Sequence, residues 1–341
     1  MPQPSEVSLP PLSSIAPSPS PQNGSPAPSQ PAPHGDSTPA ALDQAPLAYE
    51  SAAFLDSSEG RPVRILAEYA EPMARFREQR IEDTVVFFGS ARFRSMEAAE
   101  AELANVDTEA AATPDSHDHD AALQAARAAV NMAQFYEDAR SLAQKHATWA
   151  RSLPGPRHRF VVTSGGGPGI MEAANRGAWE VGARTIGLNI TLPFEQQPNR
   201  WITPELNFNF HYFFMRKFWF ASLAKALVIF PGGFGTLDEA FELLTLAQTG
   251  KLQKKLCVVL YGRDYWKSIL NLEVMAERGA ISFRDLDLFQ YADTPEEAFA
   301  LLQTGLLPLC DTSPDPSDPT PPADPAPSPQ QILGPDIAHT R

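Results

Sequence analysis

Two glycine-rich segments of the sequence have the composition of anion-binding turns. Residues 165–169 read GGGPG and residues 231–235 read PGGFG, and each lies between a short apolar run and a helical pattern. Glycine lets backbone N–H groups approach a phosphate closely, and the start of a helix adds about half a positive charge. The segments therefore predict a phosphate site. The alternative is a pair of tight strand-to-helix turns without a ligand.

The first glycine segment matches neither of two common nucleotide motifs. It is not the dinucleotide-binding fingerprint, because no acidic residue ends the next apolar run, and it is not a Walker loop, because no Gly-Lys-Ser/Thr follows. Whatever anion it binds is therefore held in a different way.

A threonine and a carboxylate follow the second glycine segment. Thr236 and Glu239 have the spacing of a capping box, in which the glutamate side chain reaches back to the threonine N–H. Spacing alone favours that structural role. Glu239 also stands in the first turn of a helix beside a glycine loop, where the sugar of a bound phosphorylated compound would lie. It is therefore a candidate catalytic carboxylate as well.

Arg216 and Lys217 interrupt an aromatic helical segment at 211–223. Basic side chains on a core helix can simply extend to the solvent. The arginine fork also binds phosphate or carboxylate through two hydrogen bonds. Both interpretations are open at this point.

Short apolar runs alternate with longer helical patterns along the chain. Strands are predicted at 84–88, 159–163, 184–190, 206–210, 226–230, 255–261 and 288–291. Helices are predicted at 62–80, 126–150, 170–181, 211–223, 265–277 and 295–303, with another that ends near residue 248. Continuous apolar strands between helices are typical of a parallel sheet covered on both faces.

We therefore expect an α/β fold, a Rossmann-like doubly wound parallel sheet in a single domain at residues 49–310, with a variable insertion at 97–125. Ligands bind such sheets beyond the carboxyl ends of the strands. Glycine loops follow the runs at 84–88, 159–163 and 226–230, so they should converge on one edge.

Proline is concentrated at both ends: 13 of 34 prolines lie in residues 1–46 and 9 lie in residues 311–341. Such segments bury too little apolar surface to order, which predicts disordered tails at 1–48 and 311–341. The net charge of −14 argues against nucleic-acid and anionic-membrane partners. With no secretory pattern, no apolar run near the roughly 18 residues of a membrane helix and no disulfide framework, the expected location is the cytoplasm.

Together these motifs resemble the LOG family of cytokinin riboside 5'-monophosphate phosphoribohydrolases. The matching segments are GGGPGIME at 165–172, MRK at 215–217, PGGFGTLDE at 231–239, LTLAQTGK at 244–251 and VLYG at 259–262. The resemblance covers residues 80–305. Many bacterial relatives carry a lysine decarboxylase label, but that reaction would use a lysine Schiff base with pyridoxal phosphate, and no lysine in these motifs suits that role.

The resemblance implies that Arg216 and Glu239 are catalytic. It implies a substrate- and phosphate-binding set made of Ser90, Gly166, Gly167, Lys217, Gly233, Gly235 and Thr236. The implied reaction is hydrolysis of the N-glycosidic bond of a purine or cytokinin nucleoside 5'-monophosphate, without a metal or other cofactor, by a homodimer or larger homo-oligomer.

Two departures from the short plant-like members indicate the longer bacterial branch. The segment at 214–217 is FMRK where those members have HERK, and Glu172 stands where they have glycine. The choice between a cytokinin and plain adenine is therefore open. The alternative function is that of a protein of the same fold that binds a nucleotide or molybdenum cofactor without turning it over.

Overall fold

The computed structural model describes residues 45, 47–112, 117–192, 197–251 and 256–310. The chain divides into a unit at Met1–Ser51, which contains the short 3-10 helix η1 (Ala48–Glu50), and a second unit at Ala52–Arg341. The tails predicted at 1–48 and 311–341 lie outside the described residues, apart from residues 45, 47 and 48. All further elements belong to the second unit.

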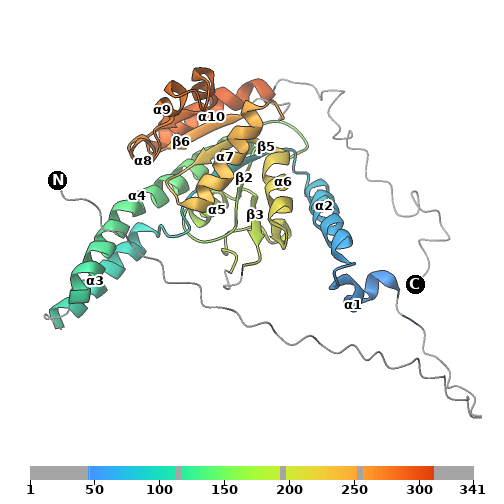
Figure 1. Cartoon of the computed structure of the whole chain (residues 1–341), viewed down its shortest axis with the longest axis horizontal. Coiled ribbons are helices and arrows are strands. Elements are labelled where there is room, and N and C mark those ends of the chain that lie inside the picture. Colours follow the sequence, from blue (N-terminus) through green and yellow to red (C-terminus); the bar gives the residue numbers. More distant parts are fainter. Residues whose placement is uncertain (1–44, 46, 113–116, 193–196, 252–255, 311–341) are drawn as a thin grey trace, which may run out of the picture. The chain divides into compact units, whose positions relative to one another are not determined.

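Seven strands form one sheet in the order β4-β3-β2-β1-β5-β6-β7, and every neighbouring pair is parallel (Figure 1). The strands are β1 (Thr84–Phe88), β2 (Val161–Ser164), β3 (Thr185–Ile190), β4 (Asn207–Phe210), β5 (Ala224–Ile229), β6 (Cys257–Tyr261) and β7 (Gln290–Ala292). The chain winds outward from β1 to β4, then returns to place β5 on the other side of β1. The predicted doubly wound, Rossmann-like α/β fold is confirmed.

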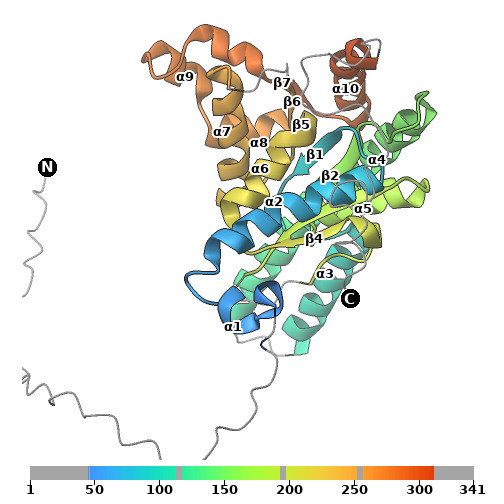
Figure 2. The ribbon, with the colours of Figure 1, turned by 90° about the vertical axis from the view of Figure 1, so that its right-hand side faces the viewer.

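Helices connect the strands and cover both faces of the sheet. They are α1 (Ala52–Leu55), α2 (Arg61–Glu78), α3 (Met96–Ala112), α4 (His117–Ser152), α5 (Ile170–Glu180), α6 (Phe213–Leu223), α7 (Phe234–Gln248), α8 (Arg263–Ile269), α9 (Leu272–Glu277) and α10 (Pro295–Cys310). The 3-10 helices η2 (Pro204–Leu206) and η3 (Phe283–Leu288) precede β4 and β7. Helices α2 and α6 lie side by side, and Tyr69 contacts Phe218 with ring centroids 5.6 Å apart (Figure 1, Figure 2).

The sheet separates two hydrophobic layers, and successive residues of β1 point into opposite ones. Val86 and Phe88 belong to the layer that includes residues of α2, α6 and α7, whereas Val85 and Phe87 belong to the layer with α4, α5 and α10. All five residues of the strand are buried. Burial on both faces explains why residues 85–88 of this strand are continuously apolar rather than alternating.

The insertion differs from the prediction. The sequence predicts a variable insertion at 97–125 and a separate helix at 126–150. Instead α4 is continuous for 36 residues. No glycine or proline interrupts residues 117–152, so nothing in that segment breaks the helix. Residues 113–116 lie outside the described residues. Helices α3 and α4 pack together with Ala99 and Ala126 buried.

The last strand also begins later than predicted. The strand expected at 288–291 is β7 at Gln290–Ala292, because η3 occupies the residues before it. A capping box starts η3: Ser282 and Asp285 exchange side-chain and backbone hydrogen bonds. Because these residues belong to η3, fewer residues remain for the edge strand β7.

Candidate active site

Three loops meet at the carboxyl ends of the central strands, as predicted. The point where the winding reverses lies between β1 and β5, which brings the loop after Phe88 beside the loop after Ile229. The Ser90 N–H donates to the Pro231 carbonyl at 3.0 Å, and the Ile170 N–H donates to the Ser90 carbonyl at 3.0 Å. Residues 89–92 therefore link the two glycine segments at one edge of the sheet.

Some loop positions need glycine because a Cβ there would overlap neighbouring atoms. At other loop positions the described residues leave open space. Gly169 has a φ of 72°, and a Cβ there would lie 2.3 Å from the Ser90 carbonyl oxygen. A Cβ at Gly232 would lie 2.2 Å from Thr236 Oγ1. A Cβ at Gly233 or Gly235 would meet no atom of the described residues within 4 Å. Open space beside those two glycines leaves room for a ligand against their N–H groups.

The central feature is an ion pair between α6 and α7. Arg216 Nη2 donates to Glu239 Oε1, and the two side chains are only 10% and 15% exposed. Arg216 Nε is buried and has no hydrogen-bond partner in the described part of the chain. The ion pair with Glu239 therefore leaves this donor of the guanidinium unused.

Burial raises the pKa of Glu239 to about 7, although the nearby charge of Arg216 acts in the opposite direction. Asp238 adds to the rise. A carboxyl group with a pKa near neutrality exists in both protonation states at physiological pH. It can therefore accept or donate a proton during a reaction at that pH.

The capping role considered for Thr236 and Glu239 is not adopted. Helix α7 starts at Phe234 with Gly233 as its N-cap residue, and no side chain caps it there. Because the helix begins earlier than the capping box would require, Thr236 lies within its first turn, buried against Gly232. Glu239 pairs with Arg216 instead.

Lys217 lies next to the ion pair but is already engaged by other carboxylates. Its Nζ is 2.9 Å from Asp238 and 2.8 Å from Glu242. Burial disfavours its charged form, but the hydrogen bonds to Glu242 and Asp238 outweigh that effect and raise its pKa. Its position suits a role in fixing α6 against α7 more than direct contact with a ligand.

Sequence reasoning missed several residues that support the loops. Asn199 and Asn175 hold the segment that contains Gly166 and Gly167, and Tyr265 donates to the Gly232 carbonyl at 2.9 Å. The sequence offered one signal for such residues, a polar side chain among small apolar neighbours, such as Asn175 in an alanine-rich helix. Their partners lie 10 or more positions away along the sequence and cannot be inferred from spacing.

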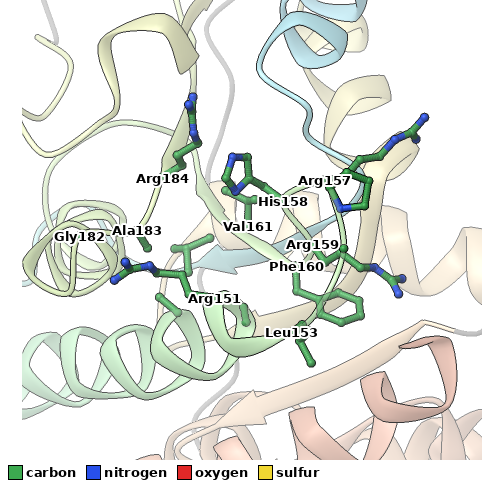
Figure 3. A pocket seen from close by; sticks show the side chains of 15 residues that line it. Arg151, Leu153, Arg157, His158, Arg159, Phe160, Val161, Gly182, Ala183 and Arg184 are labelled. Carbon is green, nitrogen blue, oxygen red and sulfur yellow. The ribbon is translucent and has the colours of Figure 1, made fainter. Parts of the chain in front are cut away.

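A cavity of about 340 Å³ lies at the opposite edge of the sheet, where residues 151–162 lead into β2 (Figure 3). Its lining includes Arg151, Arg157, His158, Arg159 and Arg184. Two of these groups donate to carbonyls at the ends of helices. The guanidinium of Arg151 donates to the Val181 carbonyl at the end of α5, and Arg159 donates to the Leu309 carbonyl and pairs with Asp83. Cations are favourable at helix C-termini, so Arg151 and Arg159 have a structural role in this lining.

In the described segments, no three His, Cys, Asp or Glu side chains come together to hold a metal ion. None of the described helices has the length and hydrophobicity that a membrane crossing requires.

The fold and the loops define a Rossmann-like α/β protein with contacting loops at the carboxyl ends of the central strands and a buried ion pair between α6 and α7. A family model described as "Possible lysine decarboxylase" matches residues 171–302. A cytokinin riboside 5'-monophosphate phosphoribohydrolase of Rhodococcoides fascians is 38% identical over 73 residues, which cover 21% of this chain and 36% of that protein. The "Probable cytokinin riboside 5'-monophosphate phosphoribohydrolase LOG4" of Oryza sativa subsp. japonica is 27% identical over 149 residues, or 43% and 63% of the two chains. The predicted resemblance to the LOG family is confirmed.

The chain thus spans less than two thirds of the length of either curated relative. Among solved structures, the molybdenum cofactor binding protein of Rippkaea orientalis has 20% identity and a TM-score of 0.35 over 50% of this chain and 86% of that one. The molybdenum cofactor carrier protein of Chlamydomonas reinhardtii has 18% identity and a TM-score of 0.35 over 66% and 99%. The fold class rests on the strand order of the sheet itself.

Proposed function

We propose that this protein hydrolyses the N-glycosidic bond of a purine or cytokinin nucleoside 5'-monophosphate and releases the free base and ribose 5-phosphate. The observation that carries the proposal is the buried Arg216–Glu239 pair at the edge where the glycine loops converge. The names of the two curated relatives support the same reaction.

In the proposed mechanism the 5'-phosphate binds the N–H groups of the glycine loops, with Thr236 as a hydroxyl donor. Departure of the base leaves positive charge on the ribose ring. Ionised Glu239 stabilises that charge or orients the attacking water, as carboxylates do at other glycosidic bonds. Water supplies the hydroxyl group to C1' and the proton to the departing base. Arg216 fixes Glu239, and its guanidinium also holds a ribose hydroxyl or the phosphate.

The direct test is incubation with AMP and with isopentenyladenosine monophosphate, followed by chromatography of the released base. We expect base release by the wild type and a loss of about 10²- to 10⁴-fold in Glu239→Gln, the range of general acid–base catalysis. Glu273→Gln is the matched control, because Glu273 lies in α9 and pairs with Lys267. Equal rates in wild type and Glu239→Gln would refute the catalytic role. Tight AMP binding without base release would identify a nucleotide-binding protein that does not turn its ligand over.

We also propose a homodimer or larger homo-oligomer that uses the aromatic surface of α6 and the α7 start. Phe213, Phe214 and Phe218 are 42–50% exposed, and Phe234 is 92% exposed. Large aromatic side chains that gather at a surface are typical of interfaces. Light scattering after size exclusion should give at least twice the 37.2 kDa chain mass. Phe214→Glu should shift the population toward the monomer.

A cytoplasmic location without nucleic-acid or membrane partners remains our expectation. The expected location comes from the sequence pattern described above, and the net charge of −14 disfavours polyanionic partners. Binding to duplex DNA or to anionic vesicles at physiological salt would contradict the expectation about partners.

A further inference from the structure

The loop at residues 165–169 is held by one asparagine side chain. Asn199 Nδ2 donates to the carbonyl oxygens of Gly166 at 3.1 Å and Gly167 at 3.0 Å. The Asn199 backbone N–H also donates to the Gly166 carbonyl at 2.8 Å. The carbonyls of two successive loop residues therefore face Asn199.

A second asparagine fixes the first. Asn175 is fully buried on α5, and its Oδ1 accepts from Asn199 Nδ2 at 2.9 Å and from Ser164 Oγ at 2.6 Å. Asn175 Nδ2 donates to the Ile186 carbonyl at 3.1 Å and to Thr185 Oγ1 on β3. With its oxygen and nitrogen both engaged, the Asn175 amide has one favourable orientation. That orientation presents an acceptor to Asn199 and leaves Asn199 its donor role.

Two further hydrogen bonds extend this network. Ser164 Oγ accepts the Gly166 N–H at 3.0 Å, and Asn199 Oδ1 accepts the Trp201 N–H at 3.2 Å. Residue 168 is proline and has no N–H. Between residues 166 and 168, the one N–H that no described residue accepts is that of Gly167.

Peptide geometry determines where this N–H points. A trans peptide places its C=O and N–H on opposite sides. The Gly166 carbonyl and the Gly167 N–H belong to the same peptide, so the N–H of Gly167 is directed away from Asn199. An oriented, unengaged amide in a glycine loop is a donor for an anion.

We propose that Asn199, supported by Asn175, is a positioning residue that turns the Gly166–Gly167 peptide so that the Gly167 N–H is held ready for the 5'-phosphate of the substrate. This inference rests on the proposed function. It also explains why asparagine stands at this position. Aspartate has the same shape, but its ionised side chain cannot donate a hydrogen bond. It would place a carboxylate against three acceptor oxygens, those of Gly166, Gly167 and the Asn175 side chain.

The test compares Asn199→Ala and Asn199→Asp with wild type, using AMP as substrate and adenosine as a competing ligand without a phosphate. We expect the KM for AMP to rise about tenfold or more in both variants, the loss of one hydrogen bond to a charged group. The inhibition constant for adenosine should change less than about twofold. The control is Asn271→Ala, which removes a comparable side-chain bond at the start of α9, to the Val274 N–H at 3.1 Å.

The results separate this inference from the proposed function. Unchanged affinity for AMP in Asn199→Ala would overturn the positioning role, and so would an equal loss for AMP and adenosine, which would indicate general damage to the fold. To test the loop without catalysis, inorganic phosphate is titrated into wild-type protein labelled with ¹⁵N-glycine. A shift of the Gly167 amide signal is expected even if no base is ever released. No shift at saturating phosphate or AMP would refute the role of that N–H, whether or not Asn199 variants fold.

Discussion

His146 offers a quantitative test of how burial between α4 and the sheet affects the stability of the fold. Its ring is fully buried, and Nε2 lies 2.8 Å from the Phe160 carbonyl oxygen. A carbonyl only accepts, so Nε2 carries the proton of the neutral ring. Nδ1 is buried and has no hydrogen-bond partner in the described part of the chain. Protonation at low pH would therefore place a charge where nothing solvates it.

The size of the effect follows from the pKa. Burial lowers the pKa of His146 from 6.5 to about 4, although the bond to Phe160 opposes the change. The unfolded chain therefore binds a proton first as the pH falls. The stability that the neutral His146 ring contributes is fully present above pH 6.5 and is lost as the pH falls from 6.5 to 4. At about 1.36 kcal/mol for each unit of pKa, the total loss is about 3 kcal/mol, of which about 2 kcal/mol is lost by pH 5.

The assay is urea or thermal unfolding of wild type and His146→Gln between pH 8 and 5. Glutamine can still donate to the Phe160 carbonyl but does not titrate. Wild type should lose about 2 kcal/mol more than the variant over this range, or roughly 4–8 °C in Tm for a domain of this size. Exposed His211→Gln should keep the wild-type slope. Parallel curves for wild type and His146→Gln would show that the buried imidazole does not control this pH dependence.

Three further predictions concern the site and the core. Burial raises the pKa of Glu239 to about 7, and the proposed mechanism uses its ionised form. The rate of base release should therefore fall as the pH drops below 7, and a flat rate profile down to pH 5 would contradict this. Gly169→Ala should destabilise the fold by more than about 2 kcal/mol, measured by urea unfolding, because its φ is positive and the new Cβ would overlap the Ser90 carbonyl. Asp83→Ala should cost about 3–5 kcal/mol in the same measurement, since it leaves Arg159 without its buried carboxylate at 2.7 Å; a loss below 1 kcal/mol would refute that estimate.

Periodicity and glycine placement predicted the sheet and its functional edge. The apolar run at 84–88 is β1, and the helix predicted at 62–80 is α2 at Arg61–Glu78. The three glycine loops converge because parallel strands end at one edge, which depends on the fold class and not on details of packing. The loops that carry Ser90, Gly169 and Gly232 therefore lie against one another.

Tertiary contacts determine the side-chain partners that the sequence did not predict. Thr236 and Glu239 have capping-box spacing, yet the helix begins at Phe234 and the glutamate pairs with an arginine from another helix. Asn199 carries no local pattern, because its partners Gly166 and Asn175 are 33 and 24 residues away. Such side chains become visible only when the loops are folded against each other.

The bonds between the loops also bear on how quickly a ligand is captured. The Ser90 N–H bonds to Pro231 and the Ser90 carbonyl receives the Ile170 N–H, so the loop after β1 joins the other two before any ligand arrives. A preorganised cradle loses little conformational entropy on binding. Association with a nucleotide should then proceed in one concentration-dependent phase, without a slow isomerisation, when followed by stopped-flow measurements.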